Sequence, residues 1–165
     1  MKAPEYVVNS CEPGVLSGAE LAACLAIIKA GGAVAVDLEK LRGATVLTVV
    51  RSDGQIVGVG AVKRVRTVYA GGIARKSGYI FPAKTPELGY VAVAPQHRRK
   101  GLSHRLVAAL VAVQRGGLFA TTYDKGMMKT LTAAGFAQKG HEWLGRKHQV
   151  SLWIRGAQAK PKVKA

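Results

Sequence analysis

The chain has 165 residues and a formal net charge of +16, from 25 lysines and arginines against 9 aspartates and glutamates. Because 48% of the residues are apolar and only 21% are charged, the composition is that of a globular protein and excludes a disordered polyelectrolyte. No apolar run approaches the ~20 residues that cross a bilayer, so a membrane-spanning protein is excluded as well. We expect one domain over residues 1–156 and a basic, disordered tail over 157–165.

In the first part of the chain, a strand and a helix precede an antiparallel pair of strands. The helix is predicted from a capping box, Ser17 to Glu20, in which the hydroxyl and the carboxylate bind each other's backbone amides. In chain order, we expect a strand over 6–8, the helix over 17–30, a segment over 33–41 that fits either a strand or a short helix, and strands over 45–51 and 55–62.

A glycine- and proline-containing basic stretch follows over residues 65–86. We interpret it as the end of a strand and a long functional loop, because Gly71-Gly72, Pro82 and Pro86 interrupt any regular element.

The second part of the chain alternates strands and helices. In order, we expect a strand over 87–93, a helix over 102–114, a strand over 118–122, a short helix over 126–134 and a closing antiparallel pair over 137–143 and 149–154. This order predicts an α/β protein in which helices pack on a central sheet.

The turn after residues 87–93 is the most informative segment of the chain. Basic residues and Gly101 stand immediately before a helix start. Such a turn directs free backbone amides and the positive end of a helix dipole at one point. This predicts an anion site, although a plain connection with solvated charges also fits the pattern.

The same turn resembles motif A of the GNAT superfamily of acetyl-CoA-dependent N-acyltransferases, Arg/Gln-x-x-Gly-x-Gly/Ala after a strand ending in Val-x-Pro. Here it reads Arg98-Arg-Lys-Gly-Leu-Ser103, with Ser103 in place of the usual Gly or Ala. Ala134-Gly-Phe136 resembles the end of motif B, and the order of elements is similar throughout. The resemblance implies a GNAT-like fold: a central, mostly antiparallel, splayed sheet of six to seven strands flanked by about four helices.

The resemblance also implies a binding site for acetyl-CoA as co-substrate. Backbone amides of the turn would bind the pyrophosphate, and the end of the preceding strand would pair with the pantetheine arm. The residues implied in cofactor binding are Val91, Ala92, Val93, Gln96, His97, Arg98, Arg99, Lys100, Gly101, Leu102 and Ser103.

Acetyl transfer to an amine requires a proton acceptor, because an amine with a pKa of about 10.4 is protonated at neutral pH and has no free lone pair. Glu87 is similar in its place to the general base of the family's histone-acetylating branch; the alternative is a charge at a strand start.

The resemblance leaves the acid that protonates the leaving thiolate open, because Leu131 stands where many members have tyrosine. Tyr123 is the nearest phenol in sequence and our candidate, although a packed aromatic at a strand end also fits. Other candidate donors are Ser103, His104 and His141.

No metal is expected, because the four histidines and the two cysteines, Cys11 and Cys24, lack ligand spacing. The first residues lack the apolar stretch of a signal peptide, so we expect a reducing, cytoplasmic setting. Because dimers are frequent in the family that the chain resembles, a homodimer is also considered.

The acceptor is expected to be anionic or to accompany a polyanion. Coenzyme A carries roughly −4, so it accounts for only part of the positive charge. A strongly basic surface attracts nucleic acid, which suggests an amine on an aminoacyl-tRNA or on a modified DNA base. Two alternatives stay open: a small-molecule amine with an incidentally basic surface, and a catalytically weakened module that binds nucleic acid or senses coenzyme A. The candidate substrate-binding residues are Lys63, Arg64, Arg66, Arg75 and Lys76.

Overall fold

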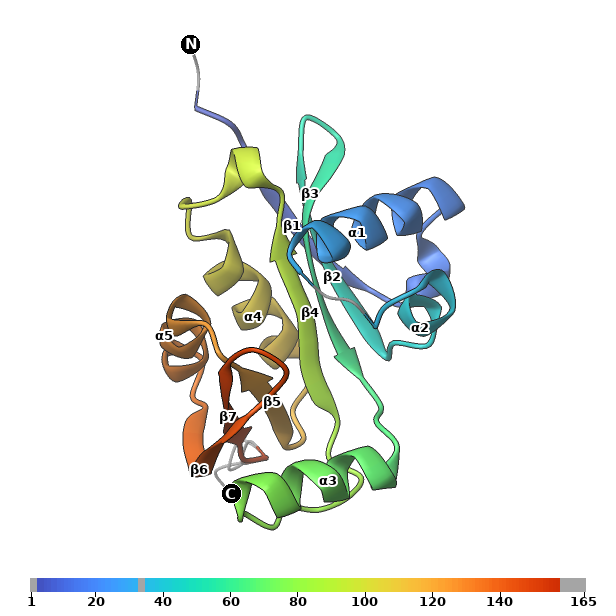
Figure 1. Ribbon diagram of the computed structural model, residues 1–165. Helices are drawn as coiled ribbons and strands as arrows, with labels where there is room; N and C mark the ends of the chain where they lie inside the picture. Colours follow the sequence, from blue (N-terminus) through green and yellow to red (C-terminus); the bar gives the residue numbers. More distant parts are fainter. Residues whose placement is uncertain (1–2, 33–34, 158–165) are drawn as a thin grey trace, which may run out of the picture.

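A seven-stranded sheet of order β1-β2-β3-β4-β5-β7-β6 organises the chain in the computed structural model, which describes residues 3–32 and 35–157 (Figure 1). All neighbouring strands are antiparallel except β4 and β5, which are parallel. The predicted α/β class and the mostly antiparallel sheet are therefore confirmed. The strands are β1 (Val7–Cys11), β2 (Val46–Ser52), β3 (Gln55–Lys63), β4 (Glu87–Val93), β5 (Leu118–Thr122), β6 (Ala137–Leu144) and β7 (Gln149–Arg155).

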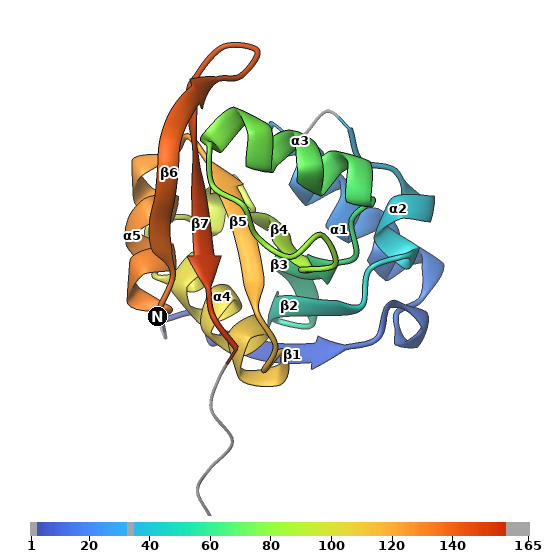
Figure 2. The same ribbon diagram turned by 90° about the horizontal axis from the view of Figure 1, so that it is seen from below.

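Helices cover both faces of this sheet. Helices α1, α2 and α3 lie on one face, and α4 and α5 lie on the other (Figures 1 and 2). None of the helices in the described ranges is both long and apolar enough to cross a membrane. The helices are α1 (Gly18–Ala30), α2 (Leu38–Arg42), α3 (Thr67–Ser77), α4 (Leu102–Val113) and α5 (Lys125–Ala133), with 3-10 turns at Pro13–Val15 and Pro95–His97.

The start of the chain follows its sequence signals closely. The capping box of α1 is confirmed: the Ser17 hydroxyl accepts from the Glu20 amide, and the Glu20 carboxylate accepts from the Ser17 amide, each at 3.1 Å. The ambiguous segment 33–41 contains the start of α2, while residues 33 and 34 lie outside the described residues. Strand β1 is longer than predicted, because it pairs with β2 over all five of its residues.

The predicted loop over residues 65–86 is wrong for its first half, which forms α3. Gly71 and Gly72 lower the intrinsic helix propensity by about 1 kcal/mol each. The helix is stabilised instead by tertiary packing, because Ala70 and Ile73 are buried against the sheet beside Phe119. It ends at Gly78, which adopts a left-handed conformation with φ +71°.

The sheet opens between β4 and β5. Within the described residues, these two strands share a single bridging pair, Glu87 with Phe119, and they separate beyond it. Strand β4 also carries a β-bulge opposite β3, where Tyr90 has φ +55°. The consequence is an edge of β4 that faces an opening in the middle of the sheet rather than a neighbouring strand.

Candidate functional site

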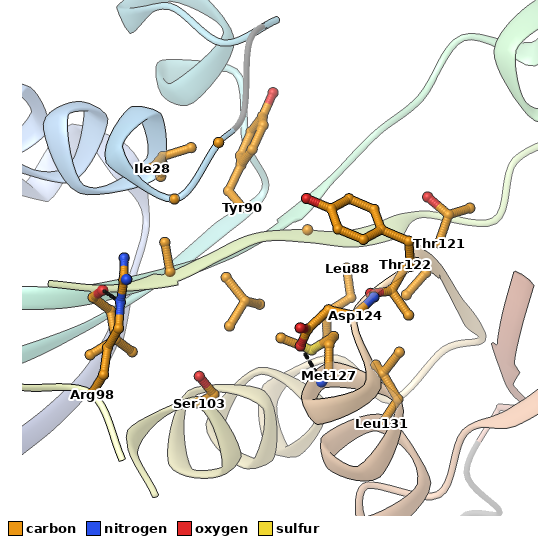
Figure 3. A pocket seen from close by; sticks show the side chains of 18 residues that line it. Ile28, Leu88, Tyr90, Arg98, Ser103, Thr121, Thr122, Asp124, Met127 and Leu131 are labelled. Atoms are coloured by element: carbon orange, nitrogen blue, oxygen red, sulfur yellow. Dashed lines mark hydrogen bonds between the residues drawn. The ribbon is translucent and has the colours of Figure 1, made fainter. Parts of the chain in front are cut away.

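A cleft of about 480 Å³ occupies this opening (Figure 3). Its walls are residues 88–93 of β4, residues 120–124 at the end of β5, the C-terminal end of α1 and the first turns of α4 and α5. Figure 3 shows Tyr90 and Ile28 on one side of β4, and Ser103 and Met127 on the other. The cleft therefore reaches both faces of the sheet.

The turn between β4 and α4 forms one end of the cleft. Gly101 is the N-cap of α4 with φ +73°, and no side chain caps the first turn of this helix. Its first backbone amides and the positive end of its dipole are thus available to an anion. A second hollow of about 250 Å³ lies against this turn and shares Val93, Arg98, Ser103, Asp124 and Met127 with the cleft. Together they form one groove.

The structure brings most of the predicted cofactor-binding residues to this groove. Gln96 and Lys100 are exposed and are not among the residues that line either hollow. The lining residues that were predicted are Val91, Ala92, Val93, His97, Arg98, Arg99, Gly101, Leu102 and Ser103.

Two of these side chains hold the turn in place. The Arg98 guanidinium donates from Nε to the Val93 carbonyl at 3.0 Å, which joins the turn to the end of β4. The His97 ring contacts the Tyr6 ring edge to face and forms a hydrogen bond between Nδ1 and the Tyr6 hydroxyl at 2.9 Å. The backbone of the turn is therefore fixed by neighbours on both sides.

Glu87, the predicted base, lies at the start of β4 with 5% of its surface exposed. Its Oε1 is 3.0 Å from the Lys63 ammonium, and its Oε2 accepts a hydrogen bond of 3.1 Å from the Tyr69 hydroxyl. Gly89 and Tyr90 line the cleft, whereas Glu87 is not among its lining residues. The carboxylate is therefore set back from the cleft, behind the residues of β4 that line it.

Lys63 connects this carboxylate to the wall. Its ammonium lies 3.9 Å from the centroid of the Tyr90 ring, so it contacts an aromatic face as well as Glu87. A Cβ atom at Gly89 would lie 3.0 Å from Cε of Lys63, so the glycine leaves room for this side chain. Lys63 is therefore engaged within the protein, whereas the ion pairs found among the described residues involve none of the other predicted substrate-binding cations.

Tyr69 is the member of this cluster that the sequence analysis missed. Although Tyr69 is 43% exposed as a residue, partial burial of its phenol and the adjacent Glu87 carboxylate raise the pKa of Tyr69 well above the ordinary value. The phenol therefore stays protonated and serves as a hydrogen-bond donor. Its spacing of four residues from the buried Ile73 is a helical signal that the glycines of α3 obscured.

Tyr123, the predicted acid, follows β5 and lines the cleft. Tyr123 is 55% exposed, and its ring stacks on the His148 ring with centroids 4.2 Å apart and planes inclined by 14°. Leu131 also lines the cleft and is fully buried. Of the other predicted donors, Ser103 and His104 line the groove, while His141 is not among its lining residues.

The remaining predicted cations lie at the two ends of α3. Arg64 and Arg66 precede its first turn, and Arg75 and Lys76 belong to its last turn; all four are exposed. None of these four is among the described residues that line the cleft. They give α3 two basic ends, on the face of the sheet opposite α4.

Comparison with known proteins agrees with this arrangement. The model of the acetyltransferase (GNAT) family matches residues 28–136. No curated protein matches the chain.

Solved structures of low sequence identity share the fold. Escherichia coli ElaA superposes with a TM-score of 0.69 at 10% identity, over 92% of this chain and 99% of that one. A ribosomal-protein-alanine N-acetyltransferase from Brucella melitensis gives 0.65 at 21% identity, over 90% and 98%. Arabidopsis thaliana NAA60 in complex with acetyl-CoA gives 0.64 at 12% identity, over 91% and 99%.

Proposed function

This chain belongs to the acetyltransferase (GNAT) family, and we propose that it transfers the acetyl group of acetyl-CoA to a primary amine. The shape and the lining of the groove are the observations that support this proposal most strongly. The uncapped first turn of α4 suits the phosphates of coenzyme A, and the unpaired edge of β4 offers amides and carbonyls to an extended arm. The space around Gly101 is open, with no atom within 4 Å of a Cβ placed there. The residues present therefore fit the co-substrate.

Bound acetyl-CoA supplies an activated thioester, and the chain supplies the proton transfers around it. We propose that Glu87 receives the proton of the amine. Because Glu87 lies behind the wall formed by Gly89 and Tyr90, the proton passes through a bridging water or the Tyr69 hydroxyl rather than by direct contact.

We propose Tyr123 as the donor to the leaving thiolate. Leu131 has no proton to give, whereas Tyr123 lines the same cleft with a phenol. Tyr90 is the second phenol of the cleft wall. Comparison of Tyr123→Phe with Tyr90→Phe tests the choice: the former is expected to reduce kcat by about 100-fold or more, because a general acid typically contributes about 10²- to 10⁴-fold. If Tyr90→Phe reduces kcat as much as Tyr123→Phe does, or more, the choice of Tyr123 is contradicted.

The acceptor amine is carried by, or associated with, a nucleic acid in our proposal. The chain has no acidic residue between Asp53 and Glu87. The basic residues of that stretch gather around α3, on the face opposite the α4 turn, and would attract a polyanion to the open side of the cleft. The basic residues are Lys63, Arg64, Arg66, Arg75, Lys76 and Lys84.

The experiment that tests this function is transfer of label from acetyl-CoA to charged tRNA, uncharged tRNA, DNA and a free small amine. We expect transfer to an amine-bearing nucleic acid, and loss of at least 100-fold in Glu87→Gln. Preference for the free small amine contradicts the acceptor class. Salt-sensitive nucleic-acid binding without any transfer contradicts the enzymatic proposal and supports a binding module instead.

Three further expectations stay predictions: a single domain over residues 1–156, a cytoplasmic setting and a homodimer. The predicted basic tail over 157–165 lies outside the described residues from residue 158 onward.

A further inference from the structure

An exposed stack of two aromatic rings stands at the rim of the cleft. Tyr123 and His148 are both exposed, and their rings lie nearly parallel at 4.2 Å. A parallel pair of flat rings in solvent still presents an outer face on which a third flat ring can stack. The stack joins the end of β5 to the turn between β6 and β7, a segment 25 positions later in the chain.

The stack lies on the acceptor side of the groove. Along β5, Ala120 packs toward α4, whereas Phe119 packs against α3, so alternation directs residue 123 toward the face of α3. The α4 turn proposed for coenzyme A lies on the opposite face. The turn that carries His148 projects from the rest of the molecule (Figure 2). An acceptor that enters from the α3 face therefore meets this stack before it reaches the cleft.

Positive charge surrounds the stack. Arg146 and Lys147 precede His148 in the turn, Lys125 begins α5 two residues after Tyr123, and all three are exposed. The ion pairs found in the described part of the chain, Arg51 with Glu20 and Lys63 with Glu87, do not involve them. After Glu142 the sequence contains no acidic residue. Asp124, the carboxylate next to Tyr123, accepts from the Met127 amide at the start of α5 and forms neither of these ion pairs, so the three cations remain available to an anion.

We propose that Tyr123, His148, Arg146 and Lys147 form a docking platform for one nucleotide unit of the acceptor. The base stacks on the exposed ring face, and a phosphate contacts the cations of the turn. A flat ring joined to an anion is the chemistry that matches both features, since a polyglutamate lacks the ring and a simple aliphatic amine lacks both. The inference rests on the proposed function only in identifying the platform's ligand as the acceptor.

Binding of a short, fluorescein-labelled single-stranded RNA, followed by anisotropy, tests the stacking half of the platform. His148→Ala is expected to weaken binding on the order of tenfold at fixed salt, without a change in salt dependence. His148→Phe retains a flat ring and is expected to restore most of the affinity. Circular dichroism of each variant separates loss of binding from loss of fold.

Salt dependence tests the phosphate half. Removal of one phosphate contact with Arg146→Gln is expected to reduce the slope of log K against log salt by about 0.7, the value for a single strand. Arg115→Gln is the matched control, because Arg115 is an exposed arginine that precedes β5, at the end opposite Tyr123. Because Arg115 lies away from the platform, Arg115→Gln should leave the slope of log K against log salt unchanged.

Two results overturn the platform. One is equal RNA affinity of His148→Ala and the wild type in a folded protein. The other is equal binding of a labelled polyglutamate, with the same response to His148→Ala, since this means that no base is recognised. The binding assay needs neither acetyl-CoA nor turnover. If the protein transfers no acetyl group but its variants show the expected changes in RNA binding, the proposed function fails and the platform is supported. If the protein is active but its variants bind RNA like the wild type, only the platform is refuted.

Discussion

Both oxygens of the Glu87 carboxylate are engaged, one by the Lys63 ammonium and the other by the Tyr69 hydroxyl. The carboxylate is buried, so its charge is tolerated only because these partners are present. The three residues come from β4, β3 and α3 and meet through strand register and helix packing. Their cluster connects the predicted base to the wall of the cleft.

Removal of Lys63 should therefore destabilise the protein. Lys63→Met leaves a buried carboxylate without its countercharge, and we expect a loss of about 3 kcal/mol in the free energy of unfolding, because breaking a buried pair costs about 3–5 kcal/mol and Lys63 is 24% exposed. Urea denaturation measures this. The double variant Lys63→Met/Glu87→Gln should recover most of the loss, and a double variant as unstable as the single one contradicts the pairing.

Tyr69 should make stability depend on alkaline pH. Its pKa is raised in the folded state by burial and by Glu87, so the folded state binds the phenolic proton more tightly than the unfolded state, in which the pKa is about 10. This contribution is fully present below pH ~10 and is lost as the pH rises further. The free energy of unfolding of the wild type should fall more steeply above that pH than that of Tyr69→Phe. Parallel curves contradict the assignment.

At the scale of elements, the contact between α3 and β6 positions Tyr69. Gly140 lies in a bulged part of β6 with φ +68°, and a Cβ atom there would lie only 2.3 Å from the Ser77 carbonyl oxygen at the end of α3. Only glycine combines this backbone conformation with so close an approach. The contact fixes the end of a helix whose own sequence favours helix only weakly.

Gly140→Ala should therefore displace α3 and destabilise the fold. A left-handed conformation costs a non-glycine residue about 1–2 kcal/mol, and the clash with Ser77 adds to it. We expect a fall in Tm on the order of 5 °C in a thermal melt. Gly14→Ala is the control, since a Cβ atom there has no neighbour within 4 Å. Equal Tm values for the two variants contradict the role assigned to Gly140.

Elements with strong local signals were predictable, and those that depend on tertiary packing were not. The capping box of α1, the hairpin of β2 and β3 and the basic turn before α4 are encoded in adjacent residues. Helix α3 was missed because its glycines oppose helix formation and its stability comes from burial against β5 and β7.

The same limit applies to the site. The groove residues of β4 and of the α4 turn follow one another in sequence, so a local motif identified them. Tyr69 next to Glu87 and His148 next to Tyr123 are separated by 18 and 25 positions, and no local pattern joins them.

For the whole molecule, the opening between β4 and β5 reaches both faces of the sheet, to which we assign different roles. On the face of α4, free amides and the side chains of Arg98 and Arg99 line the end of the groove. On the face of α3, the Tyr123–His148 stack stands at the rim of the cleft and exposed cations lie at both ends of α3. We therefore propose that the anionic co-substrate and the acceptor approach the same thioester from opposite sides of one sheet. This arrangement requires coenzyme A to bind at the α4 turn.

Calorimetric titration of coenzyme A into Gly101→Glu tests that point most directly. The substitution puts a carboxylate where the pyrophosphate is proposed to bind, so we expect affinity to fall by at least 100-fold, which is about 2.7 kcal/mol. Gly54→Glu is the matched control, because Gly54 also has a left-handed φ, +78°, and open space around it, in the turn between β2 and β3. It should bind coenzyme A like the wild type. Unchanged affinity in Gly101→Glu contradicts the proposed groove.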